Sequence, residues 1–267
     1  MSQNALYSII AIFSLLPAAL VTHRKDAALD HAHWTALILG VMGSGVWALA
    51  QASGAWSAGL APALWITVAV TMALFAMLSW SIQEAWRLTA LVVPYMMLIG
   101  MFGLHAPQGA TEAAAAAKHT DAWLIVHIGV SVVTYGLVTI AAVAALAAFL
   151  QERALKTKKP TKLTHKLPSV TDCEFITVRL LGWGGGILGL GLVSGMAAEF
   201  HRSGQLLVLD HKTVLSFLAF FVIGALLYAH HTTGMRGRMA ARIVLLAYLL
   251  LSLGYLGVKL VTDVFLA

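Results

Sequence analysis

Apolar runs of about 20 residues recur along the whole chain, and they constrain its fold more than any other feature. A helix of that length crosses the hydrocarbon core of a bilayer. Inside lipid every backbone N–H and C=O must be paired, which favours helices or closed barrels. Ala and Leu dominate the runs and strict two-residue alternation is absent, so helices are predicted. Only 10% of the 267 residues are charged, against roughly a quarter in soluble domains. The sequence therefore predicts an all-α integral membrane protein.

Eight membrane spans are predicted, and together they form one membrane domain. Residues 1–121 would form an N-terminal four-helix half and residues 122–267 a C-terminal four-helix half. The predicted spans are residues 5–22, 34–52, 60–82, 87–105, 122–150, 175–199, 211–231 and 239–263.

The distribution of Lys and Arg predicts the orientation of these spans. Twelve of these residues lie in the loops after the odd-numbered spans, and four lie on the opposite side. Positive charge marks the cytoplasmic side, so both termini are expected on the outer, periplasmic side of a bacterial inner membrane. No Lys or Arg precedes the first apolar run, so an uncleaved helix is expected there. The net charge of +6 is explained by the cytoplasmic loops, and no nucleic-acid partner is needed.

Polar and basic residues fill the segment 152–172, which also contains Pro160 and Pro168. We interpret it as a cytoplasmic loop, whose lysines set the topology or touch anionic membrane lipid. Trp34, Trp56, Trp65 and Trp123 lie near span ends and are interpreted as interfacial anchors.

His127 opens a polar stripe on the fifth span. His127, Ser131 and Tyr135 are four residues apart and share one helix face, with Thr134 beside them. An ionisable residue at membrane depth is costly unless it faces protein, a ligand or a cavity. We interpret His127 as a neutral imidazole that offers one nitrogen to haem iron. The alternative is an interfacial histidine that bonds a neighbouring helix.

His211 begins the seventh span, and His230 and His231 end it. His211 should therefore share the outer leaflet with His127, and two facing imidazoles are what a bis-histidine haem site requires. Asp210 is placed to orient an imidazole, and Lys212 or Arg202 to pair with a haem propionate. His230 lies about 28 Å of helix rise from His211, on the cytoplasmic side. It is either an inner haem station or an interfacial histidine beside a basic loop.

The sixth span contains the run RLLGWGGGILGLGLVSG. Three glycine pairs at a spacing of four are expected to let helices approach closely: Gly182/Gly186, Gly185/Gly189 and Gly191/Gly195. The GxGxxG-like pattern lies in a membrane helix, which excludes a dinucleotide site. Cys173 is the only cysteine, so it forms no internal disulfide and is expected to be inert. No hydrolase or metalloprotease motif is found, so no enzymatic activity is predicted.

The C-terminal half resembles the cytochrome c assembly proteins of the CcsA/HemX family, and most closely their short YpjD-like branch. The resemblance covers roughly residues 122–262. It is carried by VHIGVSVVTYG, LPSVTDCEFITVRLLGWGGGILGLGLVSG, DHKTVLSFLAF, YAHHTTGMRGR and LAYLLLSLGYLGVKL. It implies a haem-handling membrane protein connected to cytochrome c maturation.

Individual residues match the family pattern. His127 resembles the external haem-ligating histidine, and the Thr134–Tyr135 pair looks like the Ser-Tyr that follows it. His230 looks like the membrane-embedded histidine of the family, and His211 matches the start of the same helix in the YpjD-like branch.

Two departures limit what the resemblance implies. The Trp-rich loop of the haem-exporting members is replaced by HRSGQLLVLDHK, which has no tryptophan. The second external histidine after GYLGVKL is also missing, and His211 is expected to replace it.

We therefore predict a non-enzymatic inner-membrane protein that binds haem b between His127 and His211, with Tyr135 and His230 as further haem-binding candidates. Its partners would be haem, other cytochrome assembly proteins and membrane lipid. The alternative is a haem-free accessory or transporter-associated protein that reuses the fold.

Overall fold

A computed structural model describes residues 3–22, 24, 30–53, 59–106, 122–205 and 210–261, excluding the side chains at 52, 53, 122–124, 202, 203 and 259. Eight helical segments in these ranges are long and apolar enough to cross a membrane. The described residues contain no strand, which confirms the all-α membrane class. The helices are α1 (Gln3–Val21), α2 (His31–Ser53), α3 (Leu60–Ser81), the 3₁₀ turn η1 (Ala85–Leu88), α4 (Thr89–His105), α6 (Ala122–Thr157), α7 (Val170–Ser203), α8 (His211–Thr233), α9 (Gly237–Ser252), the π turn η2 (Leu253–Gly257) and α10 (Val258–Leu260).

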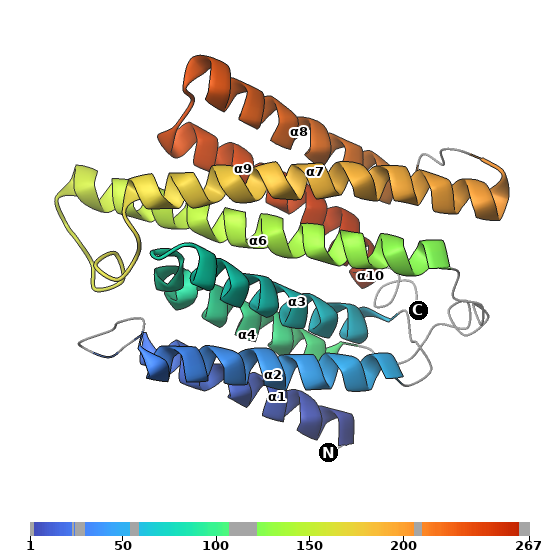
Figure 1. Cartoon of the computed structure of the whole chain (residues 1–267), viewed down its shortest axis with the longest axis horizontal. Helices are drawn as coiled ribbons and strands as arrows, with labels where there is room; N and C mark the ends of the chain where they lie inside the picture. The colour runs from blue at the N-terminus through green and yellow to red at the C-terminus, as the bar shows by residue number, and fades with distance from the viewer. Residues whose placement is uncertain are drawn as a thin grey trace.

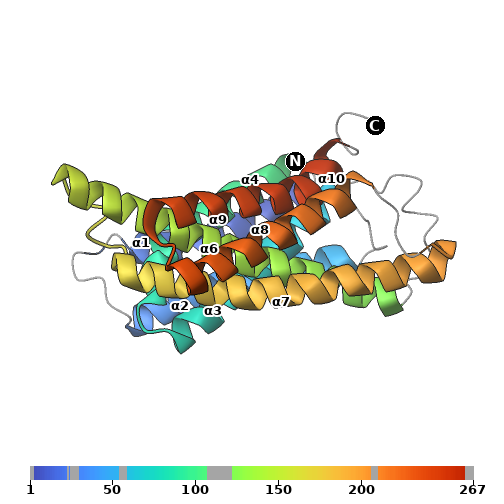
Figure 2. The same cartoon turned by 90° about the horizontal axis from the view of Figure 1, so that it is seen from above.

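The long helices run roughly side by side (Figures 1 and 2). Helices α1–α4 contact one another, as do α6–α9, and the two groups meet mainly where α3 packs on α6. Buried apolar side chains from both groups form one continuous core. The grouping brings the C-terminal helices together around α6.

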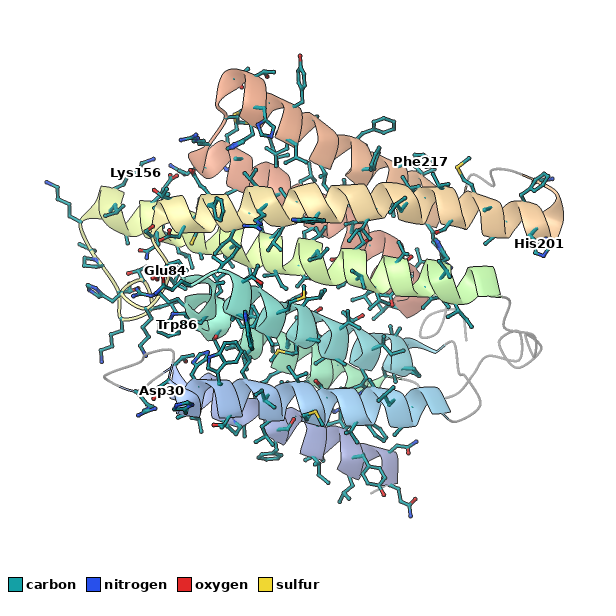
Figure 3. The ribbon with its side chains drawn as sticks, in the orientation of Figure 1. Asp30, Glu84, Trp86, Lys156, His201 and Phe217 are labelled. Atoms are coloured by element: carbon teal, nitrogen blue, oxygen red, sulfur yellow. The ribbon has the colours of Figure 1, made fainter. Side chains whose placement is uncertain are left out.

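The bundle has two distinct ends. We call the end with the first turns of α6 and α8 the His127 end, and the end where α8 finishes the His230 end. Figure 3 shows His201 at the His127 end, and Asp30, Glu84 and Lys156 at the other. His127 and His211 are thus at one end and His230 at the opposite end, as their positions in the spans predict.

The segment predicted as a polar loop is partly helical. Helix α6 continues to Thr157, because Glu, Arg, Ala, Leu and Lys favour a helix once it has left the lipid. Helix α7 begins one residue after its N-cap Ser169, whose hydroxyl accepts the Asp172 N–H. The connection between them is ordered by Gln151, whose amide donates to the carbonyls of Thr164, Leu167 and Pro168 at 2.8, 3.2 and 3.0 Å. Length and polarity alone do not reveal this anchoring.

The last predicted span is interrupted. Helix α9 ends at Ser252, and the π turn η2 follows in the run LGYLG. A Cβ on Gly254 would lie 3.3 Å from the Leu215 Cβ, so the glycine lets η2 lie close against α8. Single π turns occur frequently at functional sites.

Trp65 departs from its predicted place at the membrane interface. The side chain is fully buried, and its indole lies against Gly100 and Gly103 of α4. Trp34 is partly buried with its ring edge-to-face against Trp80, at 6.1 Å between ring centroids. Trp56 and the side chain of Trp123 lie outside the described residues.

The predicted glycine pairs have different surroundings. Gly185 and Gly189 face Ile223 and Phe220 of α8, while Gly191 and Gly195 face Val130 and His127 of α6. Gly182 and Gly186 have open space where a Cβ would be, so they are not used for packing among the described residues.

Gly136 forms the close contact between the two helix groups, and it provides a test of the fold. A Cβ there would lie 2.9 Å from the Leu74 Cδ1 and 3.5 Å from the Thr71 Cα. Overpacking a core costs about 1–3 kcal/mol. We expect Gly136→Val to lower the midpoint of thermal unfolding in detergent. Gly186→Val, which adds the same side chain to open space, should leave the midpoint close to that of the parent. Equal midpoints for both variants would contradict this α3–α6 contact.

Candidate functional site

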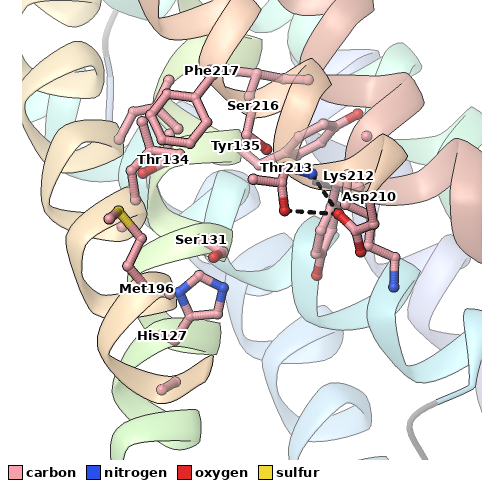
Figure 4. A pocket seen from close by; sticks show the side chains of 18 of the residues that line it. His127, Ser131, Thr134, Tyr135, Met196, Asp210, Lys212, Thr213, Ser216 and Phe217 are labelled. Carbon is pink, nitrogen blue, oxygen red and sulfur yellow. Dashed lines mark hydrogen bonds between the residues drawn. The ribbon is translucent and has the colours of Figure 1, made fainter. Parts of the chain in front are cut away.

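A cavity of about 440 Å³ lies at the His127 end. Its walls come from α6, α7, the first turns of α8, and the end of α9 with η2 (Figure 4). Small-molecule and cofactor pockets have volumes of roughly 300–1,000 Å³, so this cavity is in their range. Leu188, Leu192, Phe217 and Leu251 give it apolar surface.

Helix α6 contributes the polar stripe that its sequence spacing predicts. His127, Ser131, Thr134 and Tyr135 all line the cavity. The Thr134 side chain is 2% exposed, and its hydroxyl has no hydrogen-bond partner among the described residues. A buried hydroxyl without a partner costs about 1–3 kcal/mol, so a bond from a molecule in the cavity would offset this cost if the Thr134 hydroxyl turned toward it.

The His127 imidazole is half-buried against α7. Its Nδ1 lies 3.2 Å from the Ser194 Oγ, and the Ser194 hydroxyl donates to the Gly191 carbonyl at 3.0 Å. A Cβ on Gly195 would lie 2.9 Å from the His127 Cε1, so the ring fits only because position 195 is glycine. In Figure 4 one ring nitrogen points toward α7 and the other into the cavity.

Tyr135 forms part of the inner wall. Its hydroxyl bonds Tyr248 at 3.0 Å and Ser252 at 3.2 Å, and the Tyr248 hydroxyl also contacts that of Tyr95 on α4. Tyr255 lies in the π turn with its ring centroid 5.4 Å from that of Tyr135, and it lines the cavity too. The Tyr135 hydroxyl is therefore satisfied by protein, and its ring faces the cavity as a wall.

The start of α8 forms a polar rim. The Asp210 carboxylate caps the helix by accepting from the Thr213 N–H at 2.8 Å and hydroxyl at 2.7 Å. Burial would raise the pKa of Asp210, but these hydrogen bonds and the Lys212 charge hold it below its usual value. Among the described side chains that line the cavity, Lys212 is the one cation. The rim is therefore charged at neutral pH.

The two predicted iron ligands differ in their positions. His127 lines the cavity, whereas His211 is exposed at the first position of α8 and is not among the described residues of the cavity wall. Its neighbours Asp210 and Lys212 do line the wall. The side chain of Arg202, the other predicted propionate partner, lies outside the described residues.

His230 has different surroundings at the opposite end. Its Nδ1 donates to the Met235 carbonyl at 3.0 Å, which fastens the turn between α8 and α9. The cavity beside it has a volume of about 30 Å³, and Glu174 also lines it. That space suits a water molecule. Cys173 nearby on α7 is fully buried.

Several cavity residues were not predicted from sequence, namely Met196, Thr213, Ser216 and Tyr255. Ser194, which bonds His127, was not predicted either. They lie on helices other than α6, and their orientation depends on helix packing. The spacing of Gly191 and Gly195 is the one sequence signal that marks the α7 part of the wall.

The described residues fit haem in part. They contain no group of three or more His, Cys, Asp and Glu that could enclose a metal ion. Haem needs only one or two axial ligands, since the macrocycle supplies the rest. One imidazole nitrogen facing the cavity, apolar walls and a lysine at the rim match a flat apolar macrocycle with carboxylate groups.

Comparisons with known proteins show which family the chain belongs to. The chain is 50% identical over 271 residues to an uncharacterized 28.8 kDa protein of Azospirillum brasilense, with 100% of both chains covered. It is 31% identical to the inner membrane protein YpjD of Escherichia coli K12, over 52% of each chain. It is 23% identical to the cytochrome c biogenesis protein CcsA of Chlamydomonas reinhardtii, over 66% of this chain and 49% of that protein. No solved structure matches the chain.

A family model described as cytochrome c assembly protein matches residues 56–266, which include α3 and every helix that lines the cavity. This multi-pass membrane chain belongs to the cytochrome c assembly protein family.

Proposed function

We propose that the chain binds haem in the cavity at the His127 end and serves cytochrome c biogenesis in the inner membrane as a carrier or chaperone. Membership of the cytochrome c assembly family supports the biogenesis role. The observation that carries haem binding is the half-buried His127 ring, which directs one nitrogen into a cavity of about 440 Å³. In this role the chain would hold haem without forming a covalent bond to it.

Different residues of the cavity would contact different parts of haem. Bound haem would supply an iron centre that an imidazole nitrogen can ligate. His127 would bind the iron through its Nε2, and Lys212 at the rim would pair with a propionate. The Thr134 hydroxyl, which has no partner among the described residues, donates to the bound molecule. Leu188 and Phe217 exclude water from the macrocycle faces.

His211 remains the proposed second ligand. Its backbone lies between Asp210 and Lys212, which both reach the cavity wall. Because the side chain itself is exposed, ligation requires a rotation of the His211 side chain toward the cavity when haem enters. The periplasmic orientation predicted from the Lys and Arg residues would place this end on the side where cytochrome c is assembled.

An absorption spectrum of detergent-purified protein from haem-replete cells tests this assignment. We expect a Soret band in the parent and an at least tenfold smaller band in His127→Ala, because the ligand nitrogen is lost. His105→Ala is the matched control, since His105 is an exposed histidine whose ring, among the described residues, bonds the Met101 carbonyl of its own helix. His211→Ala should weaken the band and change its spectral type.

A colourless parent protein would reject haem binding and favour the haem-free accessory alternative. A His127→Ala variant with the full parental spectrum would reject His127 as the ligand. An unchanged spectrum in His211→Ala would assign the second axial position to another group.

The inner station at His230 is a separate prediction. If haem also binds at this end, His230→Ala should lower the haem-to-protein ratio and leave the His127-dependent spectrum in place. Quantification of extracted haem against protein concentration measures this ratio. Because the described cavity beside His230 has a volume of only about 30 Å³, bound haem there would have to lie against the outside of the helices. An unchanged ratio in His230→Ala would reject the inner station.

A further inference from the structure

The contact between His127 and Ser194 determines which nitrogen of the imidazole carries its proton. A neutral imidazole has one N–H and one nitrogen with a free lone pair, and which is which depends on the partners. The partner of Nδ1 is the Ser194 Oγ, 3.2 Å away on α7. This pair of atoms can bond only if one of them supplies a hydrogen.

The Ser194 hydroxyl already uses its single hydrogen. Its Oγ lies 3.0 Å from the carbonyl oxygen of Gly191, and a carbonyl can only accept. With its hydrogen directed to Gly191, the hydroxyl offers a lone pair to His127, and the hydrogen in the second bond comes from Nδ1. The consequence is that Nδ1 is protonated and the lone pair is on Nε2.

We propose that Ser194 is a positioning residue that holds His127 in the Nδ1–H tautomer, so that the Nε2 lone pair is presented to the cavity. This tautomer rests on the donation of the Ser194 hydroxyl to the Gly191 carbonyl and needs no bound ligand. Its role in ligation rests on the proposed function, because only a bound iron would use the Nε2 lone pair.

The glycines of α7 make this arrangement possible. A Cβ on Gly191 would lie 3.3 Å from the Val130 Cγ1, so the glycine lets α6 approach at this turn. A Cβ on Gly195 would lie 2.9 Å from the His127 Cε1 and 3.3 Å from its Nδ1. The ring therefore lies on bare helix backbone, where the Ser194 hydroxyl is in reach. Gly191 and Gly195 provide space for α6 and for the His127 ring, and Ser194 bonds the ring nitrogen that faces α7.

The role resembles that of outer-shell groups in metal sites, which fix the orientation of ligating histidines. Removing such a partner typically costs about 10–100-fold in metal affinity. We expect Ser194→Ala to weaken haem binding by that factor. Ser194→Thr, which keeps a hydroxyl, should bind haem with an affinity close to that of the parent. Ser44→Ala is the matched control, because Ser44 is a buried serine whose hydroxyl, within the part of the chain that the structure describes, bonds carbonyls of its own helix α2.

Nitrogen NMR of the haem-free protein, labelled with ¹⁵N in its histidines, tests the tautomer without any ligand. At about pH 8, above the ordinary imidazole pKa of about 6.5, the ring is neutral. The resonances that disappear in His127→Gln belong to His127. We expect a protonated Nδ1 and an unprotonated Nε2 in the parent, and a mixture of tautomers in Ser194→Ala.

The two readouts separate the failure of this inference from failure of the proposed function. A parent protein that binds no haem but shows the Nδ1–H tautomer rejects haem binding and keeps the role of Ser194 in setting the tautomer. A protonated Nε2 in the parent overturns the inference. The inference is also overturned if Ser194→Ala has the same ¹⁵N shifts and the same haem affinity as the parent.

Discussion

The close approach of α6 and α7 is the contact on which the site depends. Lipid tails are as apolar as leucine, so helices in a membrane associate through close packing and hydrogen bonds. Three glycines of α7 allow this packing, since Gly184, Gly191 and Gly195 face Val138, Val130 and His127 of α6. The same glycine surface that joins the helices also provides the space for the imidazole. Helix association and the placement of the His127 ring therefore depend on one sequence feature.

A chain of tyrosine hydroxyls connects this helix pair to the rest of the bundle. Tyr135 of α6 and Tyr95 of α4 both bond Tyr248 of α9, which joins the N-terminal helices to the C-terminal ones. A hydroxyl in an apolar interior is costly unless it is bonded, so these three groups stabilise one arrangement of the helices. The π turn then places Tyr255 against Tyr135 and completes the inner wall of the cavity. The Tyr135 and Tyr248 hydroxyls at this wall are bonded to other protein groups.

The helices and the α6 stripe could be predicted from sequence because both depend on local periodicity. Bilayer thickness sets the span length, and a spacing of four residues puts His127, Ser131 and Tyr135 on one face. The partners of that face could not be predicted, because Ser194 and Tyr255 contact His127 and Tyr135 through the packing of other helices. The exposed position of His211 has the same origin: its membrane depth follows from sequence, whereas the direction of its side chain depends on the Asp210 cap and on packing.

The two ends of the bundle differ in the volume of the cavity found at each. The cavity at the His127 end has a volume of about 440 Å³, and the one beside His230 about 30 Å³. Since His230 is bonded to Met235 within the α8–α9 turn, its Nδ1 is occupied in holding the helices together. Of these two cavities, the one at the His127 end has the volume of a cofactor site, and a nitrogen of the His127 ring faces it.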